Sequence, residues 1–453
     1  MTLNAAVMPT NSTRHLETYR NDWQQFIVGS SSNGVAPNPV PDLRNTGWRE
    51  FERIGFPIHR RGNELWKYTD LRQIDRTEFR FGVLSSSVDR DELNQRVPLA
   101  DAWHNVVFVD GMLDESLSDT GDAPAGSALK PIADFGLLGE LADCTDNAFV
   151  ALNTAFLSDG LFLEVADDSE VDTPIHLVFV TTGGESGLRG VYPRIAIAVG
   201  KGGSVTMIES HISVSDATHL SAPVSEITLG EDATLTHYRL QIDGEKSFHF
   251  ATTRVLQEGN SDYRSTSFSV GSDIGRNDVF TQLVGEYAES TLHGVYLTTN
   301  RQHQDNEIST THTAPHCTSD QYYKGILSGR SRAVFSGKIT VERGAQKTDA
   351  NQKDLNLLLS HGAEVDTKPS LEIYADDVKC AHGATAGHVD EDTLFYLQSR
   401  GVDYNTAQAM LIRGFVAEIL SEFEDDELLA FLESQLDTLM PELQAASDTI
   451  GTA

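Results

Sequence analysis

The residue types best suited to chemistry lie in one short segment, 378–383, which reads Val-Lys-Cys-Ala-His-Gly. Cysteine and histidine are ligands that suit iron or zinc. Residues i and i+2 of an extended strand point to the same face, so we expect Cys380 and His382 to face one ligand together. A closed metal site usually has four ligands. The segment therefore predicts either half of a metal site, completed from elsewhere such as another subunit, or a structural cysteine beside a hydrogen-bonded histidine.

Other cysteines and histidines give weaker signals. His312, His316 and Cys317 are close in sequence, but Pro315 marks their segment as a loop or a strand edge. We interpret this group as a surface loop. The remaining candidates are expected to be structural, with packed or hydrogen-bonded side chains: Cys144, His293 and His303.

Common catalytic motifs are absent from the sequence. It contains no Gly-x-x-x-x-Gly-Lys-Ser/Thr loop to cradle phosphates, which argues against intrinsic ATPase activity. It also contains no Gly-x-Ser-x-Gly elbow and no His-Glu-x-x-His pair. Lys67 and Lys338 are isolated lysines without a partner pattern. The sequence therefore predicts a protein that is not an enzyme.

Charge and composition narrow the range of partners and compartments. The chain has 453 residues, 67 of them acidic and 34 basic, with a formal charge of −33. Such a surface repels phosphate backbones and anionic lipids, so we expect no nucleic acid and no membrane as partners. Three distant cysteines, no signal-peptide pattern and no membrane-length apolar run favour a cytoplasmic protein.

The sequence divides into three regions, which together must position the candidate site residues. Region 1–160 is predicted to be mostly helical, because apolar residues recur there at helical spacing. The region from 389 to 453 has acidic helix starts and amphipathic spacing, which predict three helices at 390–400, 406–423 and 427–443. The elements expected in the first region are helices at 13–27, 48–54 and 135–156, a loop at 30–46 and a strand at 105–111.

The central region, 161–388, is predicted to be a β-solenoid. Short β-rich runs alternate with turns, and apolar anchors recur near Val199, Leu229, Leu256 and Leu283, a period of roughly 27–30 residues. Stacked repeats of this kind bury a continuous core. Helical patterns are almost absent, which argues against parallel strands joined by helices. A sandwich or a jelly roll is the alternative.

Long segments of the chain resemble the SufB/SufD family of the SUF iron–sulfur cluster assembly machinery. The main likeness is the run 321–414, which contains the Cys-x-His segment, and the likeness extends over most of 55–423. Three further segments carry it: GNELWKYTDL (62–71), ALNTAFLSDGLFLEV (151–165) and YPRIAIAVGKGGSVTMIES (192–210).

The resemblance is closer to the SufD branch than to the SufB branch. Residues 379–385 read Lys-Cys-Ala-His-Gly-Ala-Thr and match the SufD-type pattern, whereas SufB-type chains have His-Glu-Ala-Thr. SufB-type chains also carry a cysteine, central to sulfur handling, at the position of Ile373. The isoleucine argues against a SufB role.

The family implies a fold and a function. The fold would be a right-handed parallel β-helix with helical N-terminal and C-terminal regions. The function would be a scaffold that pairs with a SufB-type paralogue at the β-helix edge, docks a SufC-type ATPase through region 389–453 and supports iron acquisition. His382, with Cys380 beside it, would help to form a nascent iron–sulfur cluster at the interface. No cofactor would be tightly bound to the isolated chain, and iron or a cluster would be present transiently in the complex.

Three questions stay open. A β-helix enzyme, such as a carbohydrate-active protein, would need a pair of carboxylates in a groove, and the sequence shows no recognisable pair. A SufB-like role in a minimal system is a further alternative, against which Ile373 weighs. The sequence also leaves open a homodimer in the absence of the partner.

Overall fold

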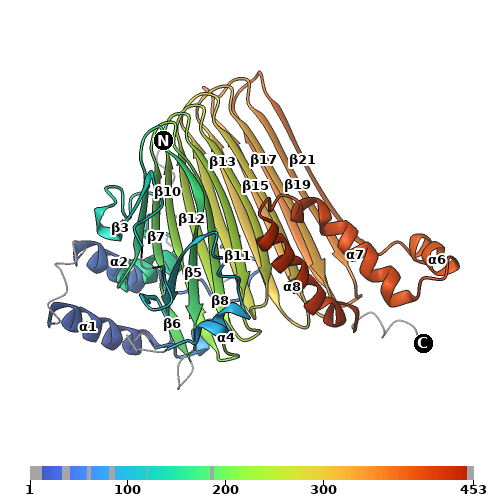
Figure 1. The fold of residues 1–453 in the computed structure, drawn as a ribbon, viewed down its shortest axis with the longest axis horizontal. Coiled ribbons are helices and arrows are strands. Elements are labelled where there is room, and N and C mark those ends of the chain that lie inside the picture. Colours follow the sequence, from blue (N-terminus) through green and yellow to red (C-terminus); the bar gives the residue numbers. More distant parts are fainter. Residues whose placement is uncertain are drawn as a thin grey trace.

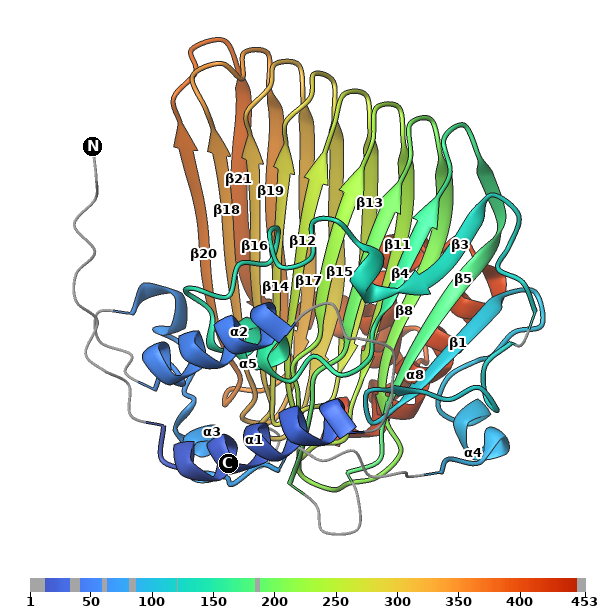
Figure 2. The same ribbon diagram turned by 90° about the vertical axis from the view of Figure 1, so that its left-hand side faces the viewer.

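A computed structural model describes residues 13–32, 41–58, 63–80, 87–119, 121–183 and 188–445. Two facing sheets form a parallel β-solenoid, which advances from the green to the orange strands of Figure 1. Helices from the two ends of the sequence cover its faces (Figure 2). The predicted solenoid with helical ends is confirmed, and the sandwich and jelly-roll alternatives are wrong.

The first sheet has ten strands, in the order β2-β1-β5-β8-β11-β13-β15-β17-β19-β21. It pairs in parallel throughout, except that β1 and β2 are antiparallel. Its strands, in chain order, are β1 (His104–Val109), β2 (Met112–Leu113), β5 (Glu170–Thr181), β8 (Ser204–Ser213), β11 (Thr234–Ile242), β13 (Asp262–Val270), β15 (Glu289–Thr298), β17 (Thr318–Leu327), β19 (Asp349–Leu358) and β21 (Lys379–His388).

The second sheet has eleven strands, of which nine follow the order β20-β18-β16-β14-β12-β10-β7-β4-β3. The remaining two, β6 (Arg189–Val191) and β9 (His219–Ser221), pair beside them. Only β3 and β4 pair antiparallel among the strands described for this sheet. The nine strands, in chain order, are β3 (Ser127–Pro131), β4 (Leu161–Val165), β7 (Arg194–Val199), β10 (Val224–Leu229), β12 (Phe248–Gln257), β14 (Ile274–Leu283), β16 (His303–His312), β18 (Arg332–Val341) and β20 (Glu364–Ile373).

The ladder register corrects one of the predicted repeat anchors. Val199, Leu229, Gln257 and Leu283 are successive neighbours across β7, β10, β12 and β14. The sequence pattern had selected Leu256, which is one position out of this stack. The buried Gln257 takes the position because its Nε2 donates to the Glu289 carbonyl at 2.7 Å. A buried polar side chain, bonded through its amide nitrogen, therefore replaces an apolar one in the lumen.

Helices from the N-terminal part cover the outer face of the second sheet. The three longest are α1 (Leu16–Ser32), α2 (Pro41–Ile54) and α5 (Ala148–Ala155). The predicted loop at 30–46 is wrong at both ends, because α1 extends to Ser32 and α2 begins at Pro41; residues 33–40 lie outside the described ranges. Proline suits the first helical position, where its missing N–H needs no partner. The short helical turns are η1 (Glu64–Trp66), α3 (Arg72–Arg76), α4 (Arg90–Asn94) and η2 (Ile132–Asp134).

The predicted helix at 135–156 is correct only in its last part, since α5 is the one helix that forms within it. The buried carboxylate of Glu226 binds the segment in another conformation. It accepts backbone N–H groups of Gly139 at 3.0 Å, Leu141 at 3.2 Å and Ala142 at 3.1 Å. Gly139 has a φ of +81°, which a helix does not allow. Hydrogen bonds to the distant Glu226 carboxylate therefore hold this segment in a conformation other than the helix that its local spacing predicts.

Three helices follow the solenoid: α6 (Glu391–Ser399), α7 (Tyr404–Leu420) and α8 (Asp426–Ala445). Buried apolar residues of α7 and α8 pack with outward-facing residues of the first sheet, including Leu240 and Phe268. Lys324 of β17 fixes α7 by donating to the Phe415 carbonyl at 2.8 Å. Within the described residues, no helix has both the length and the apolar composition needed to cross a bilayer.

Candidate functional site

The solenoid has one open end, formed by the last strand of each sheet. Among the described strands, β21 has β19 as its one ladder neighbour and β20 has β18. Each of the two strands therefore leaves a row of backbone N–H and C=O groups without a strand partner. We call β20, β21 and the lumen between them the open end.

Cys380 and His382 lie on one face of β21, at the mouth of the lumen. Their neighbours in the β19 ladder are Ala350 and Gln352, both buried. Because side chains of paired residues point to the same face of a sheet, Cys380 and His382 share the lumen-facing side. They are about 6.7 Å apart along the strand. This spacing allows the two side chains to approach one small group from the same side.

Cys380 is half-buried, and its environment keeps the thiol protonated. It packs against a small buried apolar cluster that includes Ala350, as do Leu371 of β20 and Val378. Burial raises the pKa of the thiol, and the negative charge of Asp349 raises it further. Since the thiolate is the form that binds metal, a bound cation would have to displace the proton.

His382 is exposed, and the opposite face of β21 is open at Gly383 and Gly387. A Cβ added at Gly383 or Gly387 would meet no atom within 4 Å. In the part of the chain that the structure describes, no three His, Cys, Asp or Glu side chains gather in a way that could hold a metal ion. Cys380 and His382 therefore have no third protein ligand within this part.

The opposite wall of the open end was not identified from the sequence. On β20, Ile373 is 40% exposed although it continues the buried stack of Val341. The adjacent Tyr374 is also exposed. Under β21, the buried carboxyl of Asp354 is the ladder neighbour of Ala384, and burial raises its pKa to about 6. These positions depend on strand register, which the local sequence does not reveal.

The second group of sequence candidates does not converge. His312, which lies in β16 and not in a loop, is buried with Nε2 2.8 Å from Ser319 Oγ. Exposed His316 stacks on Tyr287 with ring centroids 4.7 Å apart. The buried Cys317 thiol donates to the Gly285 carbonyl at 3.2 Å. These side chains have separate structural roles and form no metal site.

The remaining candidates are structural, as expected. His293 bridges Asp320 and Glu422, at 2.7 and 2.9 Å. His303 Nε2 lies 3.0 Å from Thr69 Oγ1. The list is completed by Cys144, which is buried among the N-terminal helices.

Helices α6 and α7 carry a second candidate surface. Four large side chains on these helices are exposed: Phe395, Tyr396, Tyr404 and Met410. Phe395 is 72% exposed, whereas the buried side of α7 packs on the first sheet. Figure 1 shows α6 extending away from the solenoid. We call these four residues the helical patch.

Comparisons with known proteins identify the family. The SufBD core domain of the SUF system for FeS cluster assembly matches residues 179–415, and the SufBD N-terminal region matches residues 30–177. An iron–sulfur cluster assembly SufBD family protein of Synechocystis is 33% identical over 83% of this chain and 85% of its own length. The iron–sulfur cluster assembly protein SufD of Escherichia coli is 33% identical over 83% of this chain and 87% of its own length. The chain therefore belongs to the SufBD family of iron–sulfur cluster assembly proteins.

Proposed function

We propose that this chain is a non-catalytic scaffold subunit that forms an iron–sulfur cluster site together with a SufB-type partner. The observation that carries the proposal is the open end, where Cys380 and His382 face the lumen beside two unpaired strand edges. Membership of the SufBD family supports iron–sulfur cluster assembly as the process in which the chain takes part.

The open end suits a partner that adds strands. Unpaired edges bind another chain by β-augmentation, in which backbone hydrogen bonds give affinity and side-chain pockets give specificity. Ile373, on β20, would become buried in such a pairing. A SufB-type paralogue has the same fold class in this proposal and would continue both sheets.

The same geometry explains why a second chain is needed for the cluster. One thiol and one imidazole cannot complete the coordination of an iron site. The partner would supply the remaining ligands, and it would also exclude water from the exposed His382. Iron and the nascent cluster are cargo in this account, so the isolated chain would retain neither tightly.

Replacing His382 by alanine tests the proposal. We expect the purified complex of the His382→Ala chain with its partners to lose most of its iron, while subunit ratio and melting temperature stay at the wild-type values. An exposed substitution changes the free energy of unfolding by no more than about 0.5 kcal/mol. His316→Ala is the matched control, because His316 is also exposed but lies in the turn between β16 and β17, two strands away from β21 in the ladder order.

Normal iron content and normal cluster transfer by His382→Ala would refute the role of this residue. A fall in melting temperature with loss of the complex would instead assign a structural role to it. Cys380→Ser in the same assay shows whether the thiol is also a ligand.

We further propose that the helical patch docks a SufC-type ATPase. Deleting the C-terminal helices is a poor test, since α7 and α8 cover apolar residues of the first sheet. The double variant Phe395→Ala and Tyr396→Ala removes exposed side chains and leaves the packed side of α7 intact. We expect the ATPase to bind at least tenfold more weakly in calorimetry, because aromatic residues dominate binding energy at interfaces. Val28→Ala, at an exposed position on α1, is the control, and equal affinity of both variants would contradict the proposal.

The scaffold proposal also implies that the ATPase partner performs all ATP chemistry. The sequence has no phosphate-cradling loop to supply backbone donors. Submicromolar ATP binding by the isolated chain would overturn this part of the account.

A further inference from the structure

Two exposed histidines lie beside each other at one rim of the open end. His388 is the last residue of β21, and its ladder neighbour is Leu358 of β19. His361 belongs to the turn that joins β19 to β20. The two imidazole centroids are 5.4 Å apart, and the ring planes are inclined at 65°. Consecutive turns of the solenoid therefore bring together two side chains that can bind metal, which we call the exposed histidine pair.

His388 shares the lumen-facing side of β21 with Cys380 and His382. The three residues are separated by even numbers of positions, which places their side chains on one face of a strand. Leu358, beside His388, packs against the core in the lumen. His388 is about 20 Å beyond His382 along the strand. One ion cannot contact both residues, so the exposed histidine pair is separate from Cys380 and His382.

A hydrogen bond holds the His388 ring in a form that can bind a metal ion. Its Nδ1 lies 2.9 Å from the Leu358 carbonyl oxygen. Because a carbonyl oxygen can only accept, Nδ1 carries the hydrogen and Nε2 of the neutral ring keeps its lone pair. Histidine ligands of metal ions commonly donate their other N–H to a backbone carbonyl in this way. His361 is exposed and forms no hydrogen bond within the described residues, so its ring nitrogens are also available.

The distance between the two rings suits two ligands of one ion. A metal–nitrogen bond of about 2.0–2.1 Å places the ring centroid about 3.2 Å from the metal. Two imidazoles at the tetrahedral angle then have centroids about 5.3 Å apart. The exposed histidine pair has a separation of 5.4 Å. The backbone therefore already holds the two rings at the distance that a shared ion requires.

The carboxylates next to the pair in sequence have other partners. Glu364, which begins β20, is 2.7 Å from Arg332. Asp390, which precedes α6, accepts the backbone N–H of Thr393 at 3.0 Å. Imidazole nitrogens are therefore the ligands that this rim offers.

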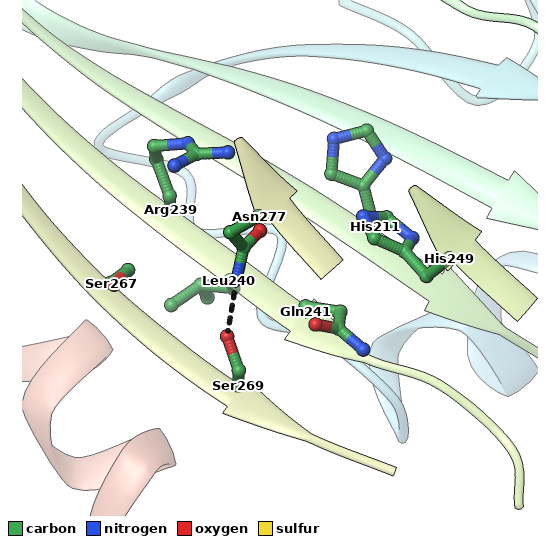
Figure 3. A pocket seen from close by; sticks show the side chains of 8 residues that line it. All are labelled: His211, Arg239, Leu240, Gln241, His249, Ser267, Ser269 and Asn277. Atoms are coloured by element: carbon green, nitrogen blue, oxygen red, sulfur yellow. Dashed lines mark hydrogen bonds between the residues drawn. The ribbon is translucent and has the colours of Figure 1, made fainter. Parts of the chain in front are cut away.

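A buried pair of imidazoles shows the contrast. His211 of β8 and His249 of β12 lie side by side in the lumen, with centroids 5.1 Å apart (Figure 3). One nitrogen of each ring faces an acid: His211 Nε2 is 2.6 Å from Glu209, and His249 Nδ1 is 3.2 Å from Asp243. The cavity beside them has a volume of about 10 Å³, which holds one water molecule. Similar ring spacing serves an internal polar cluster there, whereas the exposed histidine pair faces solvent.

We propose that the exposed histidine pair binds one divalent transition-metal ion, with one nitrogen from each imidazole as a ligand. Water molecules complete the coordination in the isolated chain. Imidazole suits zinc, iron, nickel and copper, whereas magnesium and calcium prefer oxygen ligands, so the site takes ions of the first class. The proposal does not depend on the role of Cys380 and His382.

Calorimetric titration of the full chain with Ni²⁺ tests the site, since nickel favours imidazole over the many surface carboxylates. The reference protein carries Cys380→Ser and His382→Ala, which remove the other candidate ligands. We expect it to bind one Ni²⁺ ion per chain. His361→Gln or His388→Gln, added to the reference, should weaken binding roughly 10–100-fold, as even the loss of a residue that orients a ligand does.

His316→Gln, added to the same reference, is the matched control, because His316 is exposed but stacks on Tyr287. It should leave the affinity unchanged. Equal affinity of all variants would mean that nickel binds adventitiously to the surface, and it would overturn the proposal. Binding by the wild type but not by the reference would assign the metal to Cys380 and His382 and would also overturn it.

Crystals of the wild-type chain soaked in nickel chloride give an independent test that needs no variant. We expect one anomalous peak within coordination distance of both imidazoles of the exposed histidine pair. A peak at one of these rings alone, or at carboxylates alone, would contradict the site.

Discussion

The two ends of the solenoid are built from the same repeat but finished in opposite ways. At the first end, antiparallel β2 and β3 follow the outermost parallel strands, and lumen residues such as Phe108, Leu163 and Ile197 are almost fully buried. At the open end, β20 and β21 end the sheets as parallel strands, and Ile373 is 40% exposed. The first end is therefore finished by short antiparallel strands over a buried lumen, and we call it the sealed end, although Leu113 of β2 is 41% exposed at the edge of a surface cleft of about 670 Å³. The open end has no antiparallel strand among the described residues.

This difference indicates that a binding partner would dock at the open end. A terminal repeat needs a cap, because an exposed edge and an exposed core face invite association. The sealed end is filled with large apolar residues, whereas β21 presents Ala384 and Ala386 beside Cys380 and His382. Small and metal-binding side chains leave room that a second chain can fill.

The largest stability effect is expected near the sealed end, at the buried ion pair of Arg194 and Glu226. Both side chains are fully buried, and Arg194 Nη2 lies 2.5 Å from Glu226 Oε1. Glu226→Ala leaves the guanidinium without a counter-charge, with only the neutral Asn153 and Thr154 as partners, and leaves three backbone N–H groups without their acceptor. We expect the free energy of unfolding, measured by urea denaturation, to fall by about 3–5 kcal/mol.

The control for this substitution is Glu231→Ala, which removes a half-exposed partner of Lys201. It should change the free energy of unfolding by less than about 1 kcal/mol, as exposed ion pairs do. Equal effects of the two substitutions would contradict the view that the buried ion pair stabilises this part of the solenoid more than an exposed ion pair does.

A pair of isoleucines compares the two ends directly. Ile197→Ala, in the sealed lumen, should cost about 2–5 kcal/mol, because it leaves a cavity in a packed core. Ile373→Ala should cost less than about 1 kcal/mol in the isolated chain, since the side chain is already partly in water. Urea titrations of both variants give the numbers. A large cost at Ile373 in the isolated chain would mean that the open end is already covered.

The smallest expected effect on stability is a pH dependence at His293, where the C-terminal helices pack on the first sheet. Burial disfavours the charged form of His293, but hydrogen bonds to Asp320 and Glu422 outweigh burial and raise its pKa to about 9. The unfolded chain has a histidine pKa of about 6.5. The stabilisation is therefore fully present below about pH 6.5 and is lost as the pH rises through about 9.

We expect a loss on the order of 1–3 kcal/mol between pH 6.5 and 9.5, because the two carboxylates are about one-third exposed and partly screened. Urea denaturation at the two pH values measures it. His293→Gln should be less stable at pH 6.5 and should lack this pH dependence. A variant with the wild-type pH profile would show that another group is responsible.

Local patterns predicted the solenoid and the shared face of Cys380 and His382, because a strand has a period of two that is visible in the sequence. The predictions from local patterns were wrong where contacts with residues distant in sequence determine the conformation or the register. Leu256 has the apolar character of a repeat anchor, but Gln257, whose Nε2 donates to the Glu289 carbonyl of the next turn, occupies the position instead. The segment 135–156 had helical spacing, but the Glu226 carboxylate holds its first half in another conformation.

The open end could not be predicted from sequence patterns for the same reason. Exposure of Ile373 follows from the absence of a further strand beside β20 among the described residues. The strand order that leaves β20 at the edge is set by pairing between residues about one repeat apart, which local patterns do not reveal.

Hydrogen–deuterium exchange tests the central claim most directly, since it reports on both ends of the solenoid at once. The chain would be compared alone and in complex with a SufB-type partner. The account predicts that backbone amides of β20 and β21 gain strong protection in the complex, while those of β2 and β3 do not change. Protection of the sealed end with unchanged exchange in β20 and β21 would contradict it.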